Sequence, residues 1–119
     1  MRHFTPENTK WCSKYNFVDK NNRLVGFDMH SHCCESFGWG IGLTKDEIEN
    51  SPSNEDLKPY VFANEPPTET DPPDGDCGGT ISFRLIADGK PDLWLNLYNH
   101  HNGYYSHGWE SSWAGNGYL

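Results

Sequence analysis

Long hydrophobic runs are missing from this 119-residue chain, of which only 34% is hydrophobic. A membrane-spanning helix needs roughly 20 consecutive apolar residues, and no run approaches that length. The N-terminus also lacks the basic region and the apolar region of a secretory signal peptide. The sequence therefore predicts a protein that does not sit in a membrane and that works in the cytoplasm.

Basic residues are scarce too, because 9 Lys and Arg face 17 Asp and Glu, for a formal net charge of −8. Nucleic-acid-binding proteins neutralise phosphates with Lys and Arg, so we expect no direct nucleic-acid binding. Aromatic residues make up 14% of the chain, whereas disordered chains are poor in them. A chain of this length folds around one core, so residues 1–119 are predicted to form a single domain.

The four cysteines, Cys12, Cys33, Cys34 and Cys77, include no Cys-x-x-Cys pair. This excludes a zinc ribbon and a thioredoxin-type redox motif. Cys33 and Cys34 are adjacent, and a bridge between neighbours strains the peptide that joins them. Disulfides between other pairs remain an alternative. Because cytosolic thiols are normally reduced, metal ligation or simple burial is favoured.

Alternating polar and apolar residues predict two β-hairpins, which pair residues 15–18 with 24–30 and residues 80–87 with 92–98. In the last of these strands Leu93, Leu95 and Leu97 share one face, which is predicted to be core. Asn102-Gly103 is a typical turn sequence. We therefore expect a third strand to begin at Tyr104 and to complete a meander.

A short helix is predicted from Lys45 to about Asn50, because Thr44-Lys45-Asp46-Glu47 fits a capping box. Residues 51–79 are rich in proline, glycine and acids and are predicted to form a loop. Within it, residues 60–62 are expected to form a short edge strand. The predicted fold class is α+β: mainly an antiparallel β-sheet of hairpins and a meander, with one or two short helices.

The excess negative charge lies between residues 45 and 76, which hold ten acidic and two basic residues. Such a segment is ordinarily a solvated surface that keeps a small protein in solution. It can also steer a protein toward a basic partner, with Asp71, Asp74 and Asp76 as candidate binding residues. The same aspartates suggest a calcium loop, but the closing Glu of that motif is missing.

Histidine and cysteine gather in two stretches, residues 30–34 and 100–107, which hold five of the six histidines. If the first stretch is extended, the side chains of His30, His32 and Cys34 point to the same side. Zinc prefers such nitrogen and sulfur ligands. Strand pairing can bring His100 and His107 to the same place, so the sequence predicts a zinc site with these five residues as candidate ligands.

Two alternatives use the same residues. In the first, the histidines mark a polar, partly exposed sheet end without metal, and the cysteines are simply buried. In the second, the chain is a small metal- or thiol-dependent hydrolase, with Cys33 or Cys34 as nucleophile and His101 or His107 as base. No flanking sequence matches a cysteine-protease signature.

Aromatic residues near these stretches are candidates for a second kind of site. Trp39 lies between two glycines, and Tyr104, Tyr105 and Trp109 follow the Asn102-Gly103 turn. Aromatic side chains of this kind are mostly core residues. Interleaved with glycine, asparagine and histidine, they also suit a flat binding surface at one end of the sheet.

Two stretches of the chain resemble those of small bacteriophage and prophage proteins with no assigned function. They are Cys33-Cys34-Glu35-Ser36-Phe37-Gly38-Trp39 and Leu97-Tyr98-Asn99-His100-His101-Asn102-Gly103-Tyr104-Tyr105-Ser106-His107. The shared marks are the cysteine pair and the Asn-Gly-Tyr-Tyr turn, over about a third of the chain. The resemblance implies a phage-encoded accessory protein made in a bacterial cytoplasm. It supplies no catalytic residues.

Together these observations predict a small phage or prophage accessory protein that acts by binding a host or phage protein, with a zinc ion as a predicted stabilising ligand. The hydrolase described above is one alternative. A second alternative is an acidic nucleic-acid mimic that inhibits a basic host protein, because the chain concentrates its negative charge on one segment.

Overall fold

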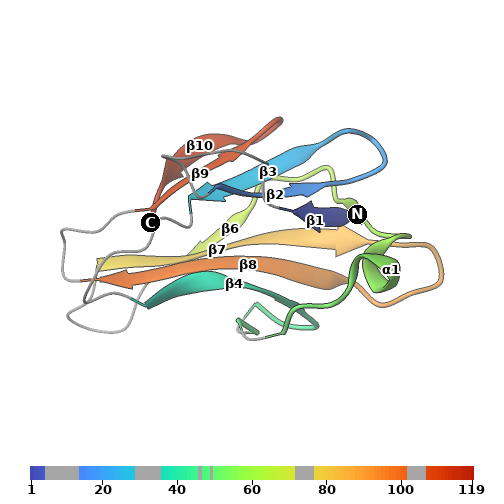
Figure 1. Cartoon of the computed structure of the whole chain (residues 1–119), viewed down its shortest axis with the longest axis horizontal. Coiled ribbons are helices and arrows are strands. Elements are labelled where there is room, and N and C mark those ends of the chain that lie inside the picture. The colour runs from blue at the N-terminus through green and yellow to red at the C-terminus, as the bar shows by residue number, and fades with distance from the viewer. Residues whose placement is uncertain (5–13, 29–35, 46, 49, 72–76, 102–106) are drawn as a thin grey trace.

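The computed structural model describes residues 1–4, 14–28, 36–45, 47–48, 50–71, 77–101 and 107–119 (Figure 1). Within them, antiparallel strands form two sheets. The first sheet has the order β1 (Arg2–Phe4), β2 (Lys14–Val18), β3 (Leu24–Asp28), β9 (Gly108–Ser111) and β10 (Gly115–Tyr118). The second has the order β4 (Ser36–Gly42), β8 (Leu93–His101), β7 (Cys77–Ile86) and β5 (Val61–Phe62), and β6 (Thr68–Thr70) also pairs with β7.

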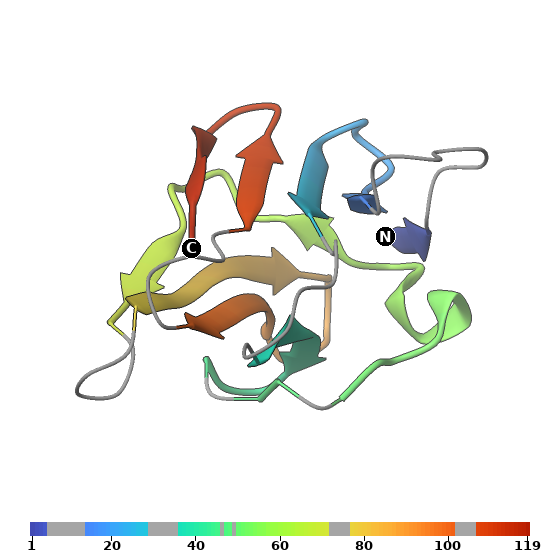
Figure 2. The ribbon, with the colours of Figure 1, turned by 60° about the vertical axis from the view of Figure 1, so that its left-hand side comes forward.

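The two sheets form two layers with one hydrophobic core between them (Figure 2). The strands that face the core contribute alternate residues to it, as strand geometry requires. Phe27 and Trp109 come from the first sheet and Phe83 and Leu95 from the second, and all four are buried. The rings of Phe83 and Trp109 meet edge to face, with centroids 5.9 Å apart. The predicted fold class, mainly antiparallel β-sheet with one short helix, is confirmed.

Both predicted hairpins are present. The first is β2 paired with β3, and the second is β7 paired with β8. Leu95 and Leu97 are completely buried, as their alternation predicts. The meander is wrong, however, because β8 is already flanked by β7 and β4. The next strand, β9, joins the other sheet. The strand expected to begin at Tyr104 starts outside the described residues.

The helix predicted for residues 45–50 is wrong. The backbone there bonds elsewhere: the Asn96 side chain donates to the carbonyls of Thr44 (3.1 Å) and Glu47 (2.9 Å), and Ile41 N–H donates to the carbonyl of Asn50 (2.8 Å). These contacts hold the segment against the outer face of the second sheet. They take carbonyl groups that helical bonding would otherwise use.

A helix lies instead inside the segment that was predicted to be a loop. This helix, α1 (Asn54–Leu57), is capped by the Ser53 hydroxyl, which accepts a 3.3 Å bond from Asp56 N–H. The expected edge strand at residues 60–62 is confirmed as β5, which among the described strands pairs with β7 alone. Residues 77–79 belong to β7, so the prediction of a loop over residues 51–79 is correct only in part.

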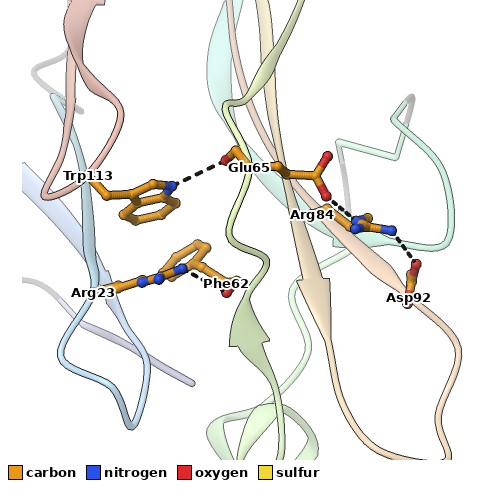
Figure 3. A network of polar contacts seen from close by, with 6 residues as sticks. All are labelled: Arg23, Phe62, Glu65, Arg84, Asp92 and Trp113. Carbon is orange, nitrogen blue, oxygen red and sulfur yellow. Dashed lines mark hydrogen bonds and ion pairs between the residues drawn. The ribbon is translucent and has the colours of Figure 1, made fainter.

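A polar network ties the two sheets together along one side (Figure 3). From the first sheet, Trp113 Nε1 donates to the carbonyl of Glu65 (3.2 Å), and the Arg23 guanidinium donates to a carbonyl of β5 (3.4 Å). The guanidinium also lies over the Trp113 ring, 5.6 Å from its centroid. From the second sheet, Arg84 forms an ion pair with the Glu65 carboxylate. The segment 62–65 is therefore held from both layers.

Within the described part of the chain, no helix has the length and apolar character that crossing a membrane requires.

Candidate functional site

Strand register brings histidine and cysteine together at one end of the sandwich, which we call the His/Cys end. At the end of the second sheet where β7 begins and β8 finishes, Cys77 pairs with His101, and Ser36 pairs with His100. Figure 1 shows β4 and β7 beginning at the left-hand end, where β3 and β8 finish. Residues far apart in the sequence thus meet here because antiparallel pairing brings strand ends together.

His107 occupies this end from the first sheet and is completely buried. Its ring stacks on Phe37, with centroids 4.2 Å apart, and its Nδ1 lies 2.5 Å from the carbonyl oxygen of Asp28. Its main chain exchanges two 2.9 Å hydrogen bonds with Leu119. A carbonyl only accepts, so Nδ1 carries the proton, and in the neutral ring Nε2 has the lone pair. Histidines that bind metal usually donate their other N–H in this way.

The predicted zinc ligands have different outcomes. His30, His32 and Cys34 lie outside the described residues, in the stretch of chain that follows Asp28 and precedes β4. His100 is half-buried beside Tyr98, with ring centroids 6.0 Å apart. Among the described residues, no three His, Cys, Asp or Glu side chains are grouped to hold a metal ion.

The predicted aromatic surface is largely internal where it is described. Trp109 is only 7% exposed and belongs to the core. Trp39 is half-buried and packs on His3, with centroids 4.9 Å apart. Both rings therefore stabilise the fold instead of forming a flat exposed surface. Tyr104 and Tyr105 lie outside the described residues.

Sequence reasoning missed the cluster around His3. Its Nδ1 lies 2.7 Å from the Tyr15 hydroxyl, and its Nε2 lies 2.9 Å from the Pro52 carbonyl oxygen. The Tyr15 hydroxyl therefore donates to Nδ1 while Nε2–H donates to the carbonyl. Burial raises the pKa of Tyr15 above its ordinary value. Each ring nitrogen thus has a partner, which identifies His3 as a link between β1, β2 and the segment before α1.

The acidic candidates are also only partly described. Asp71 is exposed, next to the exposed strand β6, while Asp74 and Asp76 lie outside the described residues. The arrangement of these three carboxylates therefore stays a prediction.

A concave site lies on the outer face of β3, β9 and β10, and among the described residues that were predicted to bind, only Trp109 belongs to its lining. This hollow has a volume of about 310 Å³ and is lined by Gly26, Asp28, Gly108, Trp109, Glu110, Asn116, Gly117 and Tyr118. Because Phe27 and Trp109 point into the core, their strand neighbours point outward. Register then places Glu110 between Gly26 and Asn116, and Gly108 opposite Tyr118.

Tyr118 is the prominent side chain of this hollow, since it is 79% exposed. A Cβ built on Gly108 would lie 3.5 Å from Cε1 of Tyr118, so the ring lies beside the bare glycine backbone. Gly117 allows β10 to lie close to the Trp109 ring, since a Cβ there would lie 3.0 Å from the indole nitrogen. We call this site the Tyr118 hollow. Besides the aromatic Trp109, the alternation of glycine with polar and aromatic residues in β10 was its signal in the sequence.

The chain matches no protein-family model, and neither the search of curated proteins nor that of solved structures finds a match. The geometry of the His/Cys end and of the Tyr118 hollow is therefore the basis for the functional interpretation.

Proposed function

We propose that the chain is a phage- or prophage-encoded accessory protein of the bacterial cytoplasm that binds another protein, and that a zinc ion at the His/Cys end stabilises it. The observation that carries the zinc proposal is the strand register that brings His100, His101 and Cys77 to the end of the sandwich where His107 stacks on Phe37. The Nδ1–H of His107 donates to the Asp28 carbonyl at 2.5 Å. This is the usual arrangement around a zinc-bound imidazole.

The sequence supplies further candidate ligands in the segment between β3 and β4. His30 follows Asp28 by two residues, and Cys34 precedes Ser36 by two. The pairing of Ser36 with His100 links those strand ends to a further imidazole. Nitrogen and thiolate donors are the set that structural zinc sites use.

Elemental analysis of protein purified without added metal tests the zinc proposal. We expect about one zinc per chain and a lower melting temperature in EDTA, because metal binding adds to the folding free energy. His30→Asn and Cys34→Ser should each lower the zinc content. His3→Gln is the matched control, since both nitrogens of His3 already have protein partners. No bound metal together with an unchanged melt in EDTA would contradict the proposal.

The binding half is tested by immobilising the zinc-loaded chain and passing a bacterial lysate over it. We expect one or a few proteins to be retained in stoichiometric amounts, and to elute when a soluble excess of the chain is added. A heat-unfolded sample of the same chain is the control. Equal retention by both samples would show non-specific adsorption and would refute a specific partner.

A further inference from the structure

Strand β10 is an outer strand of the first sheet, and its main chain is open on the side away from β9. His107 and Leu119 exchange two hydrogen bonds, and residue pairs of antiparallel strands alternate between bonded and non-bonded. The N–H and carbonyl groups of Asn116 and Tyr118 therefore point away from β9. No hydrogen bond from the described part of the chain reaches these groups, and both residues are exposed.

Two other sheet edges are capped by side chains. On β1, the Asn54 side-chain amide bonds to both main-chain groups of His3, at 2.8 and 3.4 Å. On β5, Phe62 N–H donates to Asp19 Oδ2 (3.0 Å), and the Phe62 carbonyl accepts from Arg23 (3.4 Å). These contacts take the main-chain groups that a further strand would need.

The two remaining edges are protected in other ways. On β4, Ile41 N–H donates to the carbonyl of Asn50 (2.8 Å), which belongs to the segment after that strand. Strand β6 has only three residues, and a pair of prolines stands in the sequence on each side of it. Short strands and prolines are common protections of a sheet edge.

Strand β10 has none of these protections. Its sequence, Gly-Asn-Gly-Tyr, contains no proline and no charged residue. We infer that β10 binds an extended, basic segment of a protein partner, which pairs with it antiparallel as a further strand of the first sheet. The inference rests on the proposal that the chain acts by binding, and it names the mode of binding and the chemistry of the partner. Addition of a strand to an open sheet edge is a common way of recognising a peptide.

The charge beside this edge favours a basic segment. Figures 1 and 2 both show β6, which belongs to the acidic stretch 45–76, beneath β10 on the same side of the sandwich. Glu69 of β6 is exposed and pairs with the buried Ile81, so its side chain lies on the face of β6 that is turned toward the first sheet. A strand added to β10 turns alternate side chains toward the second sheet, where Lys or Arg is attracted by this carboxylate.

A second copy of the chain fits this edge less well. Gly117 lies against the buried Trp109, so the glycines of β10 are turned toward the second sheet. A second β10 would therefore offer no cation on that side. It would also bring a second acidic stretch toward the first, and like charges repel.

Tyr118 adds a preference for the other side chains of the added strand. Its ring is 79% exposed on the outer face of the sheet, and a residue directly opposite it has its Cβ about 5 Å away. Pairs of an aromatic and a β-branched residue stabilise antiparallel strands. The expected segment therefore alternates β-branched residues, which face outward beside Tyr118, with Lys or Arg, which face the second sheet.

Amide hydrogen exchange in the isotopically labelled chain tests the pairing. The probe is a heptapeptide of alternating Lys and Val with blocked ends. At a free concentration of about ten times its Kd, it should slow exchange of the Asn116 and Tyr118 N–H groups by about 10-fold. Unchanged exchange at both amides, or the same protection by a Glu/Val peptide, would overturn the inference. So would protection that rises with chain concentration without peptide, because it would identify a second copy as the occupant.

Methylated peptides separate main-chain pairing from side-chain attraction. The valines lie opposite Asn116 and Tyr118, so the valine N–H groups point at β10 and the lysine N–H groups point away. N-methylation of the valines should weaken binding about 10-fold or more, and N-methylation of the lysines should not. Equal losses from the two methylated peptides would refute an added strand.

A matched pair of variants makes the same test on the chain. Asn116→Pro removes an outward N–H and leaves the bonds to β9 in place, since the Asn116 N–H takes no part in them. It should weaken binding of the Lys/Val peptide about 5-fold or more, whereas Asn116→Ala keeps the N–H and should bind like the wild-type chain. Equal affinities of the two variants would contradict the inference.

The charge of the partner is tested separately. Glu69→Gln/Asp71→Asn should weaken binding of the Lys/Val peptide about 2- to 5-fold. The matched control, Glu55→Gln/Asp56→Asn, removes the same charge from exposed positions in α1, which both views show far from β10. Equal losses in both double variants would refute a basic strand beside β6.

The outcomes also separate this inference from the proposed function. If a partner is captured from lysate equally well by the wild-type chain and by Asn116→Pro, the chain is a binding protein but β10 is not its binding edge. If neither a partner nor the Lys/Val peptide binds, both proposals fail. Zinc content is measured independently of both.

Discussion

Replacing Asp19 by alanine should destabilise the protein strongly, because one carboxylate holds three main-chain groups. Asp19 is only 4% exposed. Its Oδ1 accepts from the N–H groups of Asn21 (3.0 Å) and Arg23 (2.9 Å), and its Oδ2 accepts from Phe62 N–H (3.0 Å). The first two bonds shape the turn between β2 and β3. The third joins that turn to β5 in the other sheet.

The size of the effect follows from the burial of each bond. Hydrogen bonds to a charged group contribute about 1.5–3 kcal/mol, and a buried donor left without a partner costs about 1–3 kcal/mol. The bond to Phe62 N–H is buried, so its loss should cost about 2 kcal/mol. The two turn bonds are partly accessible to water, which can replace the carboxylate, so we assign about 1 kcal/mol to each. Asp19→Ala should therefore cost about 4 kcal/mol, a large share of the roughly 5–15 kcal/mol typical of a domain.

Urea unfolding followed by tryptophan fluorescence measures this cost. With a slope of about 1–3 kcal/mol per molar urea, the midpoint should fall by about 1.3 M or more. Asp19→Asn should lose less, since the remaining oxygen can still accept the two turn bonds. Asp88→Ala, in the exposed turn between β7 and β8, is the control and should change stability by less than about 0.5 kcal/mol. A loss below about 1 kcal/mol for Asp19→Ala would refute the assigned role.

Two further predictions concern the strands and the alkaline range. Gly40→Ala should lower the melting temperature by about 8 °C or more, because a Cβ on Gly40 would lie 2.6 Å from the backbone of Ile48. Gly108→Ala should barely change the melting temperature, because a Cβ there makes ordinary contacts. Equal shifts of the two variants in calorimetry would show that the segment over Gly40 moves aside without cost. Burial raises the pKa of Tyr15 above 10.0, so the folded state keeps the phenol proton at a pH where the unfolded state loses it. Stability should therefore fall as the pH rises above 10, and Tyr15→Phe should make that fall shallower in urea midpoints measured from pH 9 to 11. The same slope in Tyr15→Phe as in the wild-type chain would contradict this role of Tyr15.

Local patterns predicted the hairpins because both the strands and the turns are encoded nearby in the sequence. In the turn between β2 and β3, Asn22 adopts a φ of 62°, a conformation that asparagine tolerates better than most residues. Leu95 and Leu97 alternate with polar residues and are buried accordingly. In these elements local propensity and tertiary packing favour the same structure.

The helix prediction failed where a distant residue competes with local signals. Thr44 and Glu47 have the spacing of a capping box, but the Asn96 amide, about 50 positions away, binds both of their carbonyls. Glycines at positions 40 and 42 allow this close approach, since a Cβ at either position would lie no more than 2.6 Å from Glu47 in the overlying segment. A single sequence contains no local signal for such a contact.

The candidate sites were predictable in composition but not in position. The concentration of histidine and cysteine was evident, and register now explains why His100, His101 and Cys77 share one sheet end. The Tyr118 hollow was not predictable, because its lining comes from three strands spread over about 90 residues and depends on β3 pairing with β9. The sequence contains the glycines and carboxylates, but their adjacency requires the long-range pairing.

Asp28 connects the two candidate sites, because its main chain and its side chain belong to different ones. Its carbonyl oxygen holds Nδ1 of His107 at the His/Cys end, while the residue itself lines the Tyr118 hollow. A zinc ion bound by His107 would strengthen the hydrogen bond to that carbonyl and restrict the end of β3, which also positions the Asp28 carboxylate. If the zinc proposal holds, removing zinc with EDTA should therefore alter the amide signals of the strands that line the Tyr118 hollow.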